Sequence, residues 1–289
     1  MFFLNTRSLP AGGGVVGSVD SITILDQTNT VHPLGELIAA IRGHDVLLIT
    51  HGFNVNQMDG LEKVSNWAGL LNLGTAVPIG ILWPGDSRWI HVVDYPVEGN
   101  DAIAAGKLLS AFLSANFTSA LSLSFASHSL GARVVLQTIA GLDSSRHVRR
   151  LLLMAGAIDN TCLSDEYANA GKRPDSTSLL ASRSDDVLEW AFPAGNFVSG
   201  LFTRGTPYVH EAIGREGPSP AVTPPPNIHA DWQIPDNWDY GHGDYLPGNL
   251  PGNPAPAPIP PVVVFPGPGS PPPASKPAWS AAFETSRWP

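Results

Sequence analysis

The stretch LSLSFASHSLGARVVLQTIAGL, residues 121–142, joins two kinds of secondary structure through a very short turn. Leu121–Ala126 is a largely apolar run, which is typical of a strand buried on both faces of a parallel sheet. Leu130–Leu142 carries apolar residues at helical spacing. Because so few residues separate the two segments, the sequence predicts a strand, a tight turn and a helix in direct succession.

The same alternation continues on both sides of this stretch. Further strands are predicted at Val46–Thr50, Pro78–Trp83, Arg150–Met154 and Ser178–Ser182. Helices are predicted between them at Met58–Leu71 and Gly99–Ala115. Phe2–Thr6 and Ile22–Leu25 alternate more between apolar and polar residues, which predicts antiparallel edge strands. Strands that alternate with helices form an α/β sheet with right-handed crossovers. The predicted fold class is therefore a mostly parallel sheet flanked by helices, with reactive groups at the carboxyl ends of its strands.

Composition narrows the class of function. Lys and Arg total 16 against 25 Asp and Glu, a net charge of −9, so a nucleic-acid partner is not expected. The one cysteine, Cys162, argues against a disulfide framework and a cysteine-based zinc site. No apolar run approaches the roughly 20 residues of a membrane helix, and the N-terminus lacks signal-peptide features. We therefore expect a cytoplasmic protein without a membrane span. A secreted protein whose signal peptide has been removed is the alternative, and the oligomeric state stays open.

Proline usage divides the chain in two. The sequence has 28 prolines, and 14 of them lie within residues 246–289. A segment so rich in proline cannot supply the N–H donors that a helix or a central strand needs. We expect residues 1–245 to form the α/β domain and 246–289 to be an extended or surface-packed tail that the chemistry does not need.

The turn after Leu121–Ala126 places a serine in a particular setting. Ser127, Ser129 and Gly131 fit the small-x-Ser-x-Gly pattern of a nucleophile elbow, although glycine usually holds the first position. Such a turn lifts the Ser129 hydroxyl above the sheet and aims the Leu130 N–H at the same point. An N-capping serine in a loop would give the same letters. The position between strand and helix favours the nucleophile.

A second motif follows the strand Val46–Thr50. His51-Gly52-Phe53 has the His-Gly-X form of an oxyanion loop, in which glycine lets the backbone approach a substrate closely. The backbone N–H groups of Phe53 and Leu130 are thus the two predicted oxyanion donors.

These motifs resemble those of the α/β-hydrolase superfamily, and within it a bacterial group of small, largely uncharacterised, esterase- or lipase-like serine hydrolases. The shared pattern is HGFN at 51–54, Trp83-Pro84, HSLG at 128–131, S-x-x-D-x-x-L at 182–188 and Gly241-His242. The resemblance covers about residues 46–246 and implies an α/β-hydrolase fold. Glu98 stands where the group has an aspartate. Only about 20 residues separate the strand Arg150–Met154 from the strand Ser178–Ser182, too few for a large cap domain.

The triad acid in this fold follows the nucleophile and precedes the base. Asp185 has the matching register in S-x-x-D-x-x-L and is the predicted acid. The adjacent Asp186 would then cap the helix that begins at Val187. Asp159, one strand earlier, is the alternative acid.

His242 is the predicted base, because its flanking glycines let the loop reach towards the elbow. His229 is a second-rank candidate, and His210 lies in a helical-looking segment that favours a surface histidine. His51 and His128 are expected to be structural. The histidines are too scattered for a metal site, and no cofactor is expected.

Together these residues predict acyl transfer to water through an acyl-enzyme on Ser129, with His242 as base and Asp185 holding its tautomer. The expected substrate is a small-molecule carboxylic ester. An amidase, peptidase, thioesterase or acyltransferase would use the same triad. The alternative of a different class is a non-catalytic scaffold that recruits a partner through the Pro-rich tail.

An open cleft would suit short-to-medium acyl chains better than one long chain. The aromatic residues expected to shape it are Trp83, Trp89, Phe192 and Trp238. Packing in the core or on the surface is the other interpretation of these side chains.

Overall fold

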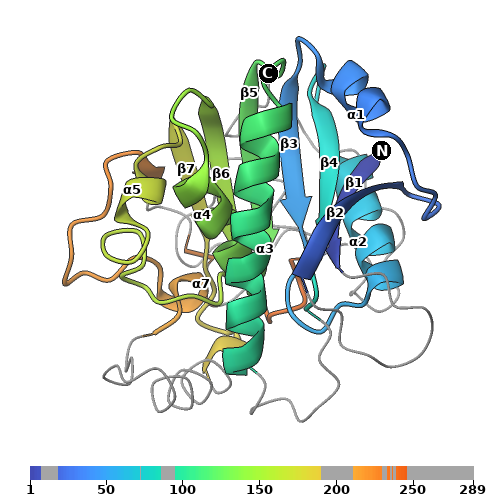
Figure 1. Cartoon of the computed structure of the whole chain (residues 1–289). Helices are drawn as coiled ribbons and strands as arrows, with labels where there is room; N and C mark the ends of the chain where they lie inside the picture. The colour runs from blue at the N-terminus through green and yellow to red at the C-terminus, as the bar shows by residue number, and fades with distance from the viewer. Residues whose placement is uncertain are drawn as a thin grey trace.

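The computed structural model describes residues 1–7, 19–71, 73–85, 95–189, 211–229, 233–234, 236 and 239–245. These residues form an eight-stranded sheet in the order β2-β1-β4-β3-β5-β6-β7-β8 (Figure 1). All neighbouring strands are parallel except β1 and β2. The strands are β1 (Phe2–Arg7), β2 (Val19–Asp26), β3 (Asp45–Thr50), β4 (Val77–Leu82), β5 (Ser122–His128), β6 (Val148–Met154), β7 (Ser176–Leu180) and β8 (Ile228–His229).

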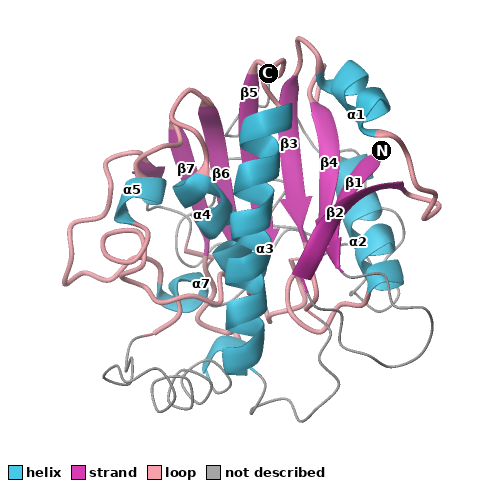
Figure 2. Ribbon diagram, in the orientation of Figure 1, coloured by secondary structure: helices cyan, strands magenta, loops and turns pink. Residues whose placement is uncertain are grey.

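Helices cover both faces of this sheet. They are α1 (Leu34–Ile41), α2 (Gln57–Leu70), α3 (Tyr95–Asn116), α4 (Gly131–Gly141), α5 (Ala168–Gly171) and α7 (Ile213–Glu216). The long helix α3 packs beside α4 on the face turned to the viewer, and α2 lies behind β1 and β4 (Figure 2). In the described ranges, no helix combines the length and apolar character needed to cross a membrane.

Local chemistry sets the ends of these helices. At the start of α2, Asn56 Oδ1 accepts the backbone N–H of Asp59, the usual arrangement of an N-cap. The guanidinium of Arg173 donates to carbonyl groups at and after the end of α4, namely those of Ile139, Leu142, Asp143 and Arg146. Arg173 thus satisfies carbonyls that a helix terminus leaves without partners.

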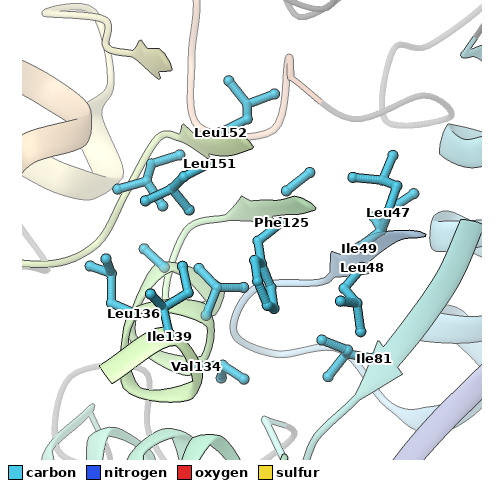
Figure 3. Close-up of a cluster of buried hydrophobic side chains, with 14 of the residues drawn as sticks. Leu47, Leu48, Ile49, Ile81, Phe125, Val134, Leu136, Ile139, Leu151 and Leu152 are labelled. Carbon is cyan, nitrogen blue, oxygen red and sulfur yellow. The ribbon is translucent and has the colours of Figure 1, made fainter. Parts of the chain in front are cut away.

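The core lies on both sides of the central strands. Leu48 pairs with Phe125 and Phe125 with Leu151, and these side chains share the face of the sheet that α4 covers (Figure 3). Leu47 and Leu152 point to the opposite face. Every residue of β5 is buried. This two-faced burial explains why the central strands form nearly unbroken apolar runs in the sequence.

The predicted fold class is confirmed: the protein has a mostly parallel sheet flanked by helices. The prediction that Phe2–Thr6 is an edge strand is wrong, because β1 lies between β2 and β4 and is parallel to β4. The antiparallel edge is β2 alone. The helix α1 and the two-residue strand β8, which extends the sheet beyond β7, were not predicted from the sequence. The connection from β6 to β7 contains only the one-turn helix α5. Residues 246–289, the predicted tail, lie outside the described residues.

A glycine contact joins the ends of β6 and β7. Gly214 donates to the carbonyl of Gly156 after β6 and accepts the N–H of Ser182 after β7, each at 3.0 Å. A Cβ atom on Gly214 would overlap the backbone of Ala155 and Gly156. Only glycine allows so close an approach. The segment around α7 therefore braces the carboxyl edge of the sheet, where the candidate site lies.

Candidate active site

The turn between β5 and α4 holds Ser129 in a left-handed conformation, with φ of +54°. Backbone hydrogen bonds fix this turn: the Ser129 N–H donates to Met154 at the end of β6, and the Ser129 carbonyl accepts the N–H of Ala157. A non-glycine residue with positive φ is uncommon and persists only where its surroundings enforce it. The strained conformation places the Ser129 side chain at the carboxyl edge of the sheet.

Two glycines allow another loop to pack against this turn. A Cβ atom on Gly131 would lie 2.5 Å from the carbonyl oxygen of His51, and one on Gly52 would lie 2.7 Å from Cβ of Ser129. The loop after β3 and the turn after β5 thus touch backbone to backbone. The small residue that the elbow pattern requires two positions after the serine is explained by this contact with His51.

Three side chains from separate segments form one hydrogen-bonded row. His242 Nε2 lies 2.8 Å from Ser129 Oγ, and His242 Nδ1 lies 2.8 Å from Asp185 Oδ2. Asp185 is fully buried, whereas 16% of the His242 side chain is exposed. The structure therefore brings together the predicted nucleophile, base and acid, with the imidazole between the hydroxyl and the carboxylate.

The two oxygens of Asp185 have different partners. While Oδ2 faces His242, Oδ1 accepts the N–H of Leu188 at 2.9 Å and so caps the helical turn that begins at Asp186. The expectation that Asp186 supplies the cap is wrong, since Asp186 is exposed and already lies within the turn. The alternative acid, Asp159, accepts the N–H and hydroxyl of Thr161 in a local turn. It is Asp185 that contacts His242.

The loop that carries His242 is held on both sides. Ser182 Oγ donates to the Tyr240 carbonyl at 2.7 Å, and the Gly241 N–H donates to the Asp244 carboxylate at 2.9 Å. The rings of Tyr240 and Tyr245 are both buried and meet edge to face. Ser182 is the first residue of S-x-x-D-x-x-L, and its hydroxyl links the loop of Asp185 to the loop of His242. Sequence reasoning used the motif without finding this contact.

The loop after β3 is shaped by His51 and Trp83. Nδ1 of His51 is 2.8 Å from the Gly52 carbonyl, and the Trp83 indole N–H donates to the His51 carbonyl at 3.0 Å. The two rings are stacked. In a trans peptide the N–H of Phe53 points away from the Gly52 carbonyl. By binding that carbonyl, His51 fixes the direction of the N–H predicted to bind an oxyanion.

Leu130, the other predicted donor, precedes the first residue of α4. Its side chain belongs to the buried core, so only its backbone faces the turn. The first N–H groups of a helix have no partner within the helix and carry partial positive charge. The N–H groups of Phe53 and Leu130 therefore belong to two backbone segments that meet next to Ser129.

Two more histidines at the site are neutral at ordinary pH. Burial lowers the pKa of His51 to about 3, with a smaller effect from the charge of Arg7. Burial, followed by the proximity of His242, lowers the pKa of His128 to about 3. Protonating either ring would bury a charge at high cost. Both histidines have hydrogen bonds to backbone carbonyls, in agreement with the structural roles expected for them.

Of the four aromatic residues predicted to shape an open cleft, the structure describes only Trp83. Trp83 is fully buried and packs on His51, so it supports the loop after β3 and does not line an open cleft. Trp89, Phe192 and Trp238 lie outside the described residues, as does His210. Of the remaining histidine candidate, His229, only the backbone is described, as part of β8. Among the described side chains, no three His, Cys, Asp or Glu gather in a way that could hold a metal ion.

The parallel sheet, the strained serine turn after β5 and the Asp185 loop after β7 define an α/β hydrolase. Over residues 26–204 the chain matches the family described as "Alpha/beta hydrolase of unknown function (DUF900)", and it belongs to this family. The matched region contains the loop after β3, Ser129 and Asp185, and it ends before His242. No protein of curated function matches the chain in sequence.

Proposed function

We propose that this hydrolase cleaves carboxylic esters with short-to-medium acyl chains through an acyl-enzyme on Ser129. The observation that carries the proposal is the position of His242, 2.8 Å from Ser129 Oγ on one side and 2.8 Å from Asp185 Oδ2 on the other. A hydroxyl, an imidazole and a buried carboxylate in this order are the components of a Ser-His-Asp triad.

The two hydrogen-bond partners of His242 determine which of its ring nitrogens carries the hydrogen. An ionised carboxylate can only accept, so Nδ1 of His242 carries the hydrogen that Asp185 accepts, and Nε2 is left to accept from the Ser129 hydroxyl. As Ser129 Oγ attacks the ester carbonyl, His242 takes its proton and becomes a cation that Asp185 stabilises. His242 then protonates the departing alkoxide, and water hydrolyses the acyl-enzyme with His242 again as base.

The oxyanion of the tetrahedral intermediate would be bound by the N–H groups of Phe53 and Leu130. Support for this assignment comes from the contact of Gly52 with Ser129 and from the bond between His51 and the Gly52 carbonyl. A preformed donor of this kind contributes about 100- to 1,000-fold to the rate. Support for shorter acyl chains comes from the β6–β7 connection, residues 155–175, whose one helix is the four-residue α5, so this connection forms no large cap.

The test is hydrolysis of p-nitrophenyl esters from acetate to laurate, beside the matching p-nitroanilides and thioesters. Ser129→Ala should abolish ester hydrolysis and labelling by a fluorophosphonate probe. Ser144→Ala is the matched control, because Ser144 is exposed in the turn after α4 and should leave both unchanged. Labelling that survives in Ser129→Ala contradicts the nucleophile. Faster cleavage of the anilides or thioesters than of the esters contradicts the substrate class.

A further inference from the structure

His128, the residue before Ser129, contacts the segment that carries the base. Its Nε2 atom lies 2.8 Å from the backbone carbonyl oxygen of His242. The centroids of the two imidazole rings are 4.9 Å apart, and His128 itself is 94% buried, with a relative exposure of 6%. The segments that carry Ser129 and His242 are thus joined by a second hydrogen bond, one that involves neither reacting side-chain atom.

The direction of this bond is defined by its acceptor. A carbonyl oxygen cannot donate, so Nε2 of His128 carries the hydrogen and Nδ1 is the unprotonated nitrogen. On its Nδ1 side the ring is confined, since a Cβ atom on Gly52 would come 3.0 Å from that nitrogen. His128 therefore sits between the loop after β3 and the His242 loop, touching both.

We propose that His128 is a positioning residue for the base: its Nε2–H fixes the backbone of His242 relative to the Ser129 turn. This inference rests on the proposed function, in which His242 moves the proton of Ser129. Ser182 anchors the same loop two residues earlier, through the Tyr240 carbonyl. His128 anchors it at His242 itself. Because a peptide bond joins His128 to Ser129, this anchor sets the spacing between Oγ of Ser129 and Nε2 of His242.

Neutrality is part of this role. His242 becomes a cation during each acyl transfer, and a charged neighbour at 4.9 Å would oppose that step. The groups whose charges act on His128 are His242, Lys63 and His51, and all of them disfavour its protonation. A neutral donor at this position therefore holds the base without lowering its basicity.

Two substitutions separate the hydrogen bond from the packing. His128→Phe keeps a ring of similar size and removes the donor. His128→Gln removes the ring and places an amide N–H near the position of Nε2. We expect kcat for p-nitrophenyl butyrate to fall about 10- to 100-fold in the Phe variant, with KM changed less than about twofold, because small misplacements of reacting groups cost rates of this size. The Gln variant should keep kcat within about threefold of the wild type.

A spectroscopic readout accompanies the kinetics. The Nδ1–H of His242, bonded to Asp185, should give a low-field proton resonance in the wild type and the Gln variant, and the Phe variant should shift or broaden it. Unchanged kcat and an unchanged resonance in the Phe variant would overturn the proposal. So would an equal loss in both variants, because the ring and not its N–H would then be what matters.

The wild-type protein tests the proposal even where a variant fails to fold by circular dichroism. In protein labelled with 15N-histidine, the ring nitrogen shifts of His128 should report the neutral Nε2–H tautomer at pH 7. An Nδ1–H tautomer or a charged ring overturns the inference. If the wild type hydrolyses no ester and Ser129 takes no fluorophosphonate, the proposed function fails, while the tautomer of His128 still decides whether the contact exists.

Discussion

Asp185 bonds His242 with one carboxylate oxygen and caps a helical turn with the other: Oδ2 lies 2.8 Å from Nδ1 of His242, and Oδ1 accepts the Leu188 N–H at 2.9 Å. The cap fixes the carboxylate's orientation before any substrate binds. A fully buried acid held in this way leaves the imidazole one preferred tautomer. These two contacts predict what replacing Asp185 with asparagine should do.

Asp185→Asn should abolish most activity while leaving the fold stable. Asparagine caps a helix about as well as aspartate, so its oxygen keeps the bond to Leu188 and its NH2 group is turned towards His242. Nδ1 of His242 must then accept, which places the hydrogen on Nε2 and blocks proton transfer from Ser129. We expect kcat to fall by about four orders of magnitude and the melting temperature to change little, as measured by ester hydrolysis and differential scanning calorimetry.

The neighbouring Asp186→Asn is the matched control. Asp186 is exposed and makes no contact with His242 among those described, so kcat should remain within about twofold of the wild type. The opposite ranking of the two variants would place the acid one residue later. Near-normal activity in both would return attention to Asp159.

The central strands could be predicted because burial on two faces leaves a plain signal. Val46–Thr50 and Arg150–Met154 fall within β3 and β6, as expected from their apolar runs. The position of β1 could not be predicted, because Asn5 and Thr6 read as a solvent-facing pattern although both are fully buried. Thr6 Oγ1 donates to the Leu82 carbonyl, a partner 76 residues away. The strand β8, with two residues, is too short to have a pattern.

The candidate site shows the same division. Ser129 and Asp185 follow strands, and His242 lies between two glycines. In both settings the local sequence pattern predicts the position of a functional residue. The supporting contacts of His128 and Ser182 join segments 114 and 58 residues apart, and no local pattern encodes them. For Trp83, an aromatic residue after a strand is compatible with a cleft wall or with the core. The bond of its indole to His51, 32 residues away, decides between them.

Trp83→Phe should weaken catalysis through the loop after β3. Phenylalanine keeps the stacking on His51 but removes the N–H that the His51 carbonyl accepts. The buried carbonyl would keep only the long contact of 3.4 Å from the Thr50 hydroxyl, and this loss costs about 1–3 kcal/mol of the free energy of unfolding. We expect that loss in urea titrations, with a kcat at least about tenfold lower, since the Phe53 N–H loses its orientation.

Phe117→Leu serves as the control for general destabilisation, because Phe117 is buried after α3, away from the site. It should lower stability by a similar amount with kcat unchanged. If Trp83 instead contacted substrate, its replacement would alter KM in proportion to acyl-chain length and leave stability nearly intact.

Gly131→Ala should damage both stability and activity. The new Cβ atom would lie 2.5 Å from the His51 carbonyl oxygen, so the Ser129 turn and the loop after β3 must separate. Overpacking of this kind costs about 1–3 kcal/mol, and the displacement should reduce kcat about 100-fold. Gly35→Ala is the matched change in α1, where nothing lies within 4 Å of the added atom. It should stabilise the protein by about 0.5–1 kcal/mol without affecting kcat, and a Gly131→Ala variant as stable and active as Gly35→Ala would contradict the close contact.

The buried histidines should make the protein sensitive to acid. The pKa of His128 is about 3 in the folded state, against 6.5 for an unburied histidine. Above pH 6.5 both states are neutral and the full stability is present. As pH falls from 6.5 towards 3, the unfolded chain takes up a proton that the folded chain refuses. The free energy of unfolding therefore declines by up to about 1.4 kcal/mol per pH unit for each such histidine.

His51, whose pKa is also about 3, contributes in the same direction, so the two together should give a slope of nearly two protons. His128→Gln removes one of them. Urea titrations at pH 7.5, 6.0 and 5.0 should therefore show the difference in unfolding free energy between wild type and His128→Gln shifting in favour of the variant by about 1.4 kcal/mol per pH unit below 6. A difference that stays constant over this range would mean that the folded protein protonates His128 as readily as the unfolded chain does, which would contradict the lowered pKa.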